Sequence, residues 1–142
     1  MAKAAVDPAT QPAHRLRVRI YYEDTDAGGI VYHANYLKFA ERARTEMIRE
    51  LGVENRAWRE QAGLSFVVQR CNASFHRPAR LDDEVDVRTS VAKIGAASLS
   101  LRQGVYRDEI LLASMDVRLA LVDRQMRPKR FPEMLIAALG PQ

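Results

Sequence analysis

The stretch YYEDTDAGGIVYHANYLKFAERARTEMIRELG, residues 21–52, holds the helical pattern around which the rest of the chain can be arranged. From Asn35 onward, apolar side chains recur at spacings of three or four and form one stripe: Tyr36, Ala40, Ala43, Met47 and Leu51. Asn35 is a favourable N-cap residue, and Gly52 is a typical helix stop. We therefore predict one amphipathic helix over 35–51, with residues 23–34 as a loop that leads into its N-terminus.

Segments on both sides of this helix alternate apolar and polar residues with the period of two that half-buried strands show. RVRIYY at 17–22 is the first, and a short helix over about 54–62 follows the long one. Four further strands and a terminal helix are predicted: LSFVVQRCNASF (64–75), EVDVRTSV (84–91), SLSLRQGVY (98–106), LASMDVRLALV (112–122) and residues 133–139. Connections between the last three strands are too short for a parallel crossover, so the sheet is antiparallel. We predict an α+β fold, with the long helix on one face of a curved five-stranded sheet whose last four strands form a meander.

Composition and charge restrict the class of protein. The 142 residues fit one domain, predicted at 15–142 after a disordered N-terminal tail at 1–14. The single cysteine, Cys71, rules out an intrachain disulfide and a four-cysteine zinc site, and its apolar strand indicates an inert core thiol. The sequence shows neither a signal peptide nor an apolar run long enough to span a bilayer, so we expect a soluble, cytoplasmic protein.

The net charge of +4 is modest for a nucleic-acid-binding protein, and no nucleic-acid partner is expected. Basic residues are scattered except for RQMRPKR at 124–130. We interpret them as a solvated surface. The alternative is an electrostatic landing place for a phosphorylated small molecule or an acidic carrier protein.

The loop before the long helix gathers groups that can do chemistry. Gly28 and Gly29 let a ligand approach the backbone, while Asp26 is accompanied by Tyr22, which is expected to point inward from the preceding strand. His33 precedes the predicted N-cap by two residues, and the helix N-terminus offers unpaired N–H groups. Each residue alone has an ordinary interpretation as a turn, a cap, a surface group or a core aromatic. Together they supply a base, orienting groups and an oxyanion hole.

Other chemistries lack essential parts. The chain has no G-x-S-x-G nucleophile elbow and no phosphate-binding glycine loop. The segment DTDAGGIVYHAN at 24–35 loosely resembles a calcium loop, but it ends in Asn35 where a bidentate glutamate is needed. Metal binding by Asp24, Asp26 and His33 has no fourth ligand in the sequence. We predict neither a metal nor a cofactor.

Residues 21–52, together with FVVQRCNASFHRPARLDDEVDV (66–87) and RPKRFP (127–132), resemble the 4-hydroxybenzoyl-CoA thioesterase-like family of hotdog proteins. The likeness is specifically to its acyl-CoA thioesterase branch associated with the Tol-Pal cell-envelope system, and it covers about residues 16–138. The resemblance implies a hotdog fold, with the sheet wrapped around the long helix, and pairing into a homodimer or homotetramer. It also implies hydrolysis of acyl-CoA thioesters, in which coenzyme A is part of the substrate and no separate cofactor is needed.

The resemblance also carries residue roles. The catalytic residues that it implies are Asp26, Tyr22 and His33, with Asp26 as general base or nucleophile and the backbone near His33 as oxyanion hole. The substrate-binding residues that it implies are Gly28, Gly29, Val31, Asn35 and Lys93, with Lys129 and Arg130 as further candidates for the coenzyme A phosphates. A second hypothesis is a non-catalytic hotdog module that binds acyl chains or acyl carrier protein. A third is acyl dehydratase chemistry on the same fold.

Overall fold

The structure, a computed structural model, describes residues 12–140. Five strands form one antiparallel sheet in the order β1-β3-β4-β5-β2. Their bounds are β1 His14–Arg19, β2 Ser65–Phe75, β3 Glu84–Ile94, β4 Ser98–Arg107 and β5 Ile110–Val122. The helices are the 3₁₀ turn η1 Tyr22–Asp24, α1 His33–Glu50, α2 Asn55–Ala57 with the π-helical turn η2 Trp58–Ala62, and α3 Glu133–Leu139. The predicted long helix, short second helix and terminal helix are therefore all present.

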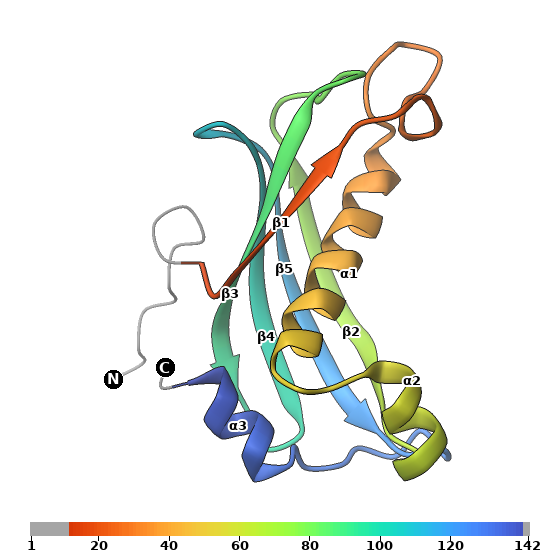
Figure 1. Cartoon of the computed structure of the whole chain (residues 1–142), viewed down its shortest axis with the longest axis vertical. Helices are drawn as coiled ribbons and strands as arrows, with labels where there is room; N and C mark the ends of the chain where they lie inside the picture. Colours follow the sequence, from red (N-terminus) through yellow and green to blue (C-terminus); the bar gives the residue numbers. More distant parts are fainter. Residues whose placement is uncertain (1–11, 141–142) are drawn as a thin grey trace.

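Helix α1 lies along one face of the curved sheet, as Figure 1 shows. The predicted stripe from Tyr36 to Met47 lies on its buried face, which also includes Phe39 and Ile48, whereas Leu51 follows the end of the helix and is only partly buried. Small residues at Ala40 and Ala43 let the helix backbone come close to the sheet, whose inward side chains are mainly valine and leucine. This is the α+β arrangement, one helix wrapped by a five-stranded antiparallel sheet, that the sequence predicts.

The start of α1 differs from the prediction. The helix begins at His33 and its N-cap is Tyr32, so Asn35 lies inside the first turn. The Asn35 side chain donates to the backbone carbonyl of Asp24 at 2.8 Å, so it holds the preceding loop and leaves capping to the backbone.

The predicted four-strand meander is only partly correct. Strands β3, β4 and β5 follow one another as predicted, but β2 pairs with β5 and leaves β3 to pair with β1. The reason lies in residues 76–83, which cross the N-terminal end of α1 (Figure 1). There the Val31 N–H donates to the Ala79 carbonyl and the Ala79 N–H donates to the Tyr36 hydroxyl, each at 2.9 Å. The crossing makes β1 and β2 the two edges of the sheet.

The edge strand β1 starts earlier and ends earlier than predicted. The Ala13 N–H already donates to the Thr89 carbonyl at 2.7 Å, and β1 begins at His14, which the predicted tail had included. Tail residues 1–11 lie outside the described residues. At the other end the strand stops at Arg19, because the Asp24 carboxylate accepts the Tyr21 N–H at 2.8 Å and turns the chain into η1.

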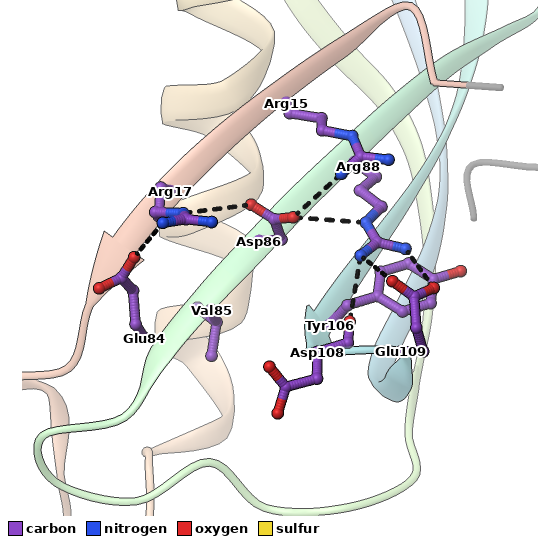
Figure 2. Close-up of a pocket in the computed structure, with 9 residues that line it drawn as sticks. All are labelled: Arg15, Arg17, Glu84, Val85, Asp86, Arg88, Tyr106, Asp108 and Glu109. Atoms are coloured by element: carbon purple, nitrogen blue, oxygen red, sulfur yellow. Dashed lines mark hydrogen bonds and ion pairs between the residues drawn. The ribbon is translucent and has the colours of Figure 1, made fainter. Parts of the chain in front are cut away.

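The outer face of the sheet carries a polar hollow of about 400 Å³, shown in Figure 2. Arg17 of β1 forms an ion pair with Glu84 of β3 at 2.8 Å. Arg88 contacts Asp86 at 3.5 Å and Glu109, in the turn between β4 and β5, at 3.2 Å. Because its arginines and acids pair with one another, this hollow fastens the β1 edge and offers little free charge to a ligand.

The other edge, β2, is open. From Val68 to Phe75 every residue of this strand is exposed. The prediction of Cys71 as a core thiol is therefore wrong: the cysteine is exposed, because it lies on an edge strand that little else covers. None of the helices within residues 12–140 combines the length and apolar character needed to cross a bilayer.

Candidate active site

The loop before α1 closes on itself around Asp26. The Asp26 N–H donates to the Ile30 carbonyl at 2.9 Å, and the Gly29 N–H donates to the Asp26 carbonyl at 3.0 Å. Gly29 has a φ of 79°, which glycine adopts without steric cost. The Gly28 N–H donates to Asp26 Oδ1 at 2.9 Å. The turn therefore fixes one carboxylate oxygen of Asp26, and Oδ2 has no hydrogen-bond partner among residues 12–140.

The same loop is tied to the first turn of α1. The Tyr32 N–H donates to the Asp24 carbonyl at 3.0 Å, and the Asn35 side chain binds that carbonyl too. The Asn35 N–H donates back to the Tyr32 carbonyl at 2.8 Å. In the described part of the chain, no acceptor is bonded to the N–H groups of His33 and Ala34. These two amides are the free donors at the positive end of the helix.

A hollow of about 240 Å³ lies between this helix end and the upper end of β2. Its lining residues are Ile30, Val31, His33, Tyr36, Phe75, His76, Arg77 and Pro78. The His33 and Phe75 rings meet edge to face with centroids 5.8 Å apart, and the Tyr36 ring is also 5.8 Å from Phe75. The hollow is an aromatic-walled cavity that adjoins the free amides.

Tyr36 and Phe75 are site residues that the sequence did not single out. Tyr36 fits the core stripe of the helix, and it is indeed buried, but its ring also forms the cavity wall. Its hydroxyl accepts the Ala79 N–H, and burial raises the pKa of Tyr36 above its usual value, so the phenol keeps its proton. The sequence offers only an indirect signal for these two aromatics. Tyr36 lies in the first turn of α1, and Phe75 is the last residue of β2.

The predicted catalytic residues are brought together only in part. His33 lines the cavity and is the first residue of α1. Asp26 is exposed at the loop tip and is not among the residues that line the cavity. Tyr22 is 82% exposed, so the expectation that it points inward is wrong. Strand alternation does not reach it, because β1 ends at Arg19 and Tyr22 begins η1.

The predicted binding residues divide in the same way. Gly28 and Gly29 form the turn, and Val31 lines the cavity while its N–H is committed to the Ala79 carbonyl. The Asn35 side chain is bonded to the Asp24 carbonyl and holds the loop in place. Lys93 lies nine residues beyond the start of β3 at Glu84, about 30 Å from this end of the sheet at the rise of a strand. Lys93 of the same chain therefore does not belong to this site.

The metal interpretation of the loop gains no support from its geometry. The Asp24 carboxylate accepts the Tyr21 N–H and helps to form η1. Across residues 12–140, no group of three or more histidine, cysteine, aspartate or glutamate side chains could hold a metal ion.

Comparison with known proteins fits this arrangement. The family model of the thioesterase-like superfamily matches residues 20–139. The chain belongs to the thioesterase-like superfamily. Among solved structures, the probable thioesterase from Bartonella henselae superposes with a TM-score of 0.80 at 34% identity, covering 84% of this chain and 98% of that one. The hotdog fold implied by the resemblance is thereby confirmed.

Two curated relatives of this superfamily member have named activities. The acyl-CoA thioesterase YbgC of Haemophilus influenzae is 43% identical over 122 residues, covering 85% of this chain and 90% of its own length. The acyl-CoA thioester hydrolase YbgC of Escherichia coli O6:H1 is 40% identical over 125 residues, covering 87% and 92%. The family resemblance drawn from residues 21–52 is therefore confirmed, whereas the roles of single residues stay predictions.

Proposed function

We propose that this protein hydrolyses acyl-CoA thioesters. The observation that carries the proposal is the joining of the Asp26 turn to the first turn of α1, whose His33 and Ala34 amides have no acceptor within residues 12–140 and adjoin an apolar cavity. A carboxylate, free donors and an apolar pocket are the parts that thioester hydrolysis needs. The activity named for the two YbgC relatives supports the same conclusion.

The proposed mechanism places the thioester carbonyl at the helix N-terminus. As an oxygen nucleophile adds to the carbonyl carbon, negative charge develops on the carbonyl oxygen, and the amides of His33 and Ala34 stabilise it. Asp26 acts in one of two ways: it takes a proton from the attacking water, or it attacks the carbonyl and forms an anhydride that water then hydrolyses. In both routes the C–S bond breaks, the thiolate leaves with little acid assistance, and the free acid and coenzyme A remain.

We propose further that the working unit is a homodimer formed through β2. This strand is an open edge: on the side away from β5 it has no partner strand within residues 12–140, and its exposed residues include Val68 at 52% and Phe75 at 47%. The cavity opens beside that edge, because Phe75 and His76 line it. A second copy that adds its own β2 would cover these residues and close the cavity toward the turn that bears Asp26.

The test of the proposed activity is Asp26→Asn, which keeps the shape of the side chain and removes its charge. We expect turnover of acyl-CoA, measured as free thiol released, to fall by about 10²-fold to 10⁴-fold, the range of a positioned acid or base. Asp116→Asn is the matched control, because Asp116 is an exposed carboxylate on the outer face, paired with Arg102. A folded Asp26→Asn protein with full turnover would end the assignment of this residue.

The same assay separates the competing functions. A non-catalytic module that holds acyl chains or acyl carrier protein releases no thiol from any acyl-CoA. A dehydratase releases water and forms an enoyl product, while the thioester stays intact. Run on acyl groups of different length and on aromatic acyl groups, the assay also defines the acyl preference.

A further inference from the structure

A second hollow lies at the opposite end of β2 from the aromatic cavity. It has a volume of about 400 Å³ and lies between α2, η2 and the first residues of the strand. Its lining residues are Asn55, Arg56, Arg59, Ser65 and Phe66. Figure 1 shows α2 beside the lower end of β2, while the N-terminus of α1 lies at the upper end. We call this hollow the lower hollow.

The lower hollow carries two guanidinium groups that form no ion pair within residues 12–140. Arg56 and Arg59 are exposed, and within residues 12–140 neither guanidinium forms an ion pair, although Glu54 and Glu60 belong to the same segment. Arg124 lies beside this segment, because its guanidinium donates to the Glu60 carbonyl at 3.2 Å, but it does not line the hollow. The outer-face hollow in Figure 2 is different, because its arginines meet carboxylates. Free guanidinium groups beside the neutral donors Asn55 and Ser65 suit a phosphate group.

Within one chain this charge cannot serve the aromatic cavity. Phe66 and Phe75 are nine residues apart on β2, which corresponds to about 30 Å along a strand. Pairing of two β2 edges changes this separation. A two-fold axis that keeps both α1 helices on one face pairs the strands antiparallel, so the Ser65 end of one strand lies beside the Phe75 end of the other. The lower hollow of each subunit then adjoins the aromatic cavity of its partner.

We propose that Arg56 and Arg59 of one subunit bind the phosphate groups of a coenzyme A thioester whose acyl end lies in the aromatic cavity of the other subunit. This inference rests on the proposed function and its β2 dimer, and it names the nucleotide contacts of that site. It differs from the expected contacts at Lys129 and Arg130, because neither residue lines the lower hollow and the Lys129 ammonium is 3.8 Å from the Asp123 carboxylate.

The phosphate contact is tested by calorimetric titration with coenzyme A, which requires no turnover. We expect Arg56→Ala and Arg59→Ala each to weaken binding about tenfold, as loss of a hydrogen bond to a charged group does. Arg42→Ala is the matched control, because Arg42 is an exposed arginine on α1 outside the lower hollow, and it should leave the affinity unchanged. Unchanged affinity in both variants, or an equal loss in the control, overturns the phosphate site.

Kinetics with a truncated substrate give a second readout. The two variants should raise KM for acyl-CoA about tenfold and leave KM for the matching acyl-pantetheine, which lacks the nucleotide, unchanged. A general structural fault would raise both values and would overturn the assignment. If the wild type hydrolyses no thioester at all, the proposed function fails, and the coenzyme A titration still decides the phosphate site.

The contribution from the partner subunit is tested by mixed dimers. Differently tagged chains, one Asp26→Asn and one Arg56→Ala/Arg59→Ala, are co-expressed and purified through both tags. If the arginines act across the interface, each mixed dimer keeps one complete site, made of Asp26 from the arginine variant and Arg56 and Arg59 from the Asp26→Asn chain. The mixed dimer should then show the wild-type KM and about half the wild-type turnover, because one of its two sites works. Contact within one subunit leaves no complete site, and KM then stays as high as in the arginine variant. That result overturns the proposal.

Discussion

Asp26 is positioned by short-range backbone contacts, and burial contributes nothing to its placement. One of its oxygens is held by the Gly28 N–H, its main chain closes the turn with Ile30, and the side chain is exposed. The two glycines of the turn have different structural roles. Gly29 supplies a left-handed backbone conformation, whereas Gly28 leaves room next to the carboxylate.

Alanine substitutions at these two glycines should therefore affect different properties, catalysis at Gly28 and stability at Gly29. A Cβ on Gly28 would lie 3.2 Å from Asp26 Oδ1, so Gly28→Ala should displace the carboxylate and lower kcat with little change in Tm. A Cβ on Gly29 meets nothing within 4 Å, but the φ of 79° strains any other residue, so Gly29→Ala should cost about 1 to 2 kcal/mol of stability. Thermal unfolding and thiol-release kinetics of both variants check this. The prediction fails if Gly28→Ala loses stability and keeps full kcat.

At the scale of elements, the open edge β2 decides how the molecule associates. Val68→Lys places a charge on this exposed edge, where a partner strand would have to pair, and charged edge residues oppose such pairing. We expect the variant to become monomeric in light scattering and to lose thioester hydrolysis. Val68→Thr keeps a β-branched side chain and should remain dimeric. A Val68→Lys protein that stays dimeric would show that the chain associates through another surface.

Local periodicity predicts the helices and strands well, because an element that is buried on one face repeats apolar residues at the spacing of that face. The apolar spacing from Tyr36 to Met47 gives the buried face of α1, and the alternation in β3 and β5 gives their inward faces. The periodicity of a strand does not indicate which other strand it pairs with. The pairing of β2 with β5 depends on how residues 76–83 cross the end of α1, which is a long-range contact. The inward direction expected for Tyr22 fails for a related reason: alternation ends where the backbone leaves the strand.

For the candidate site, the sequence identifies the loop and the helix N-terminus but not the cavity. Asp26, Gly28, Gly29 and His33 are recognisable because they fall within one short stretch. Phe75 is more than 40 positions away from His33, and only the folded sheet brings the two rings together. Spacing along the chain could not reveal that contact.

At the scale of the whole molecule, ionised carboxylates that hold turns in place make stability depend on pH. Arg88 holds the pKa of Glu109 below its usual value, first through a hydrogen bond and then through its charge. The Arg127 N–H does the same for Asp123 in the turn after β5. A group whose pKa is lowered on folding adds stability above its unfolded pKa. That contribution disappears as the pH falls through the folded pKa.

We therefore expect Tm to decrease as the pH is lowered below about 4, near the unfolded pKa of these acids. Glu109→Gln should reduce this dependence, because glutamine carries no charge that protonation can remove. Glu133→Gln is the control, since Glu133 is exposed and has no ion pair in the described chain. Calorimetric melts between pH 3 and 6 provide the measurement. If Tm falls equally steeply with decreasing pH in the wild type and in Glu109→Gln, the assigned role of the Arg88 contact is contradicted.

The crossing segment at residues 76–83 also bears on how the protein matures. Ala79 is hydrogen-bonded to both Val31 and Tyr36, so the crossover joins a loop and a helix that lie more than 40 positions earlier in the chain. Contacts between remote segments form slowly, because the intervening chain must first be ordered. Partly folded or truncated chains would therefore be catalytically silent, so newly synthesised protein could not degrade coenzyme A esters before its assembly is complete.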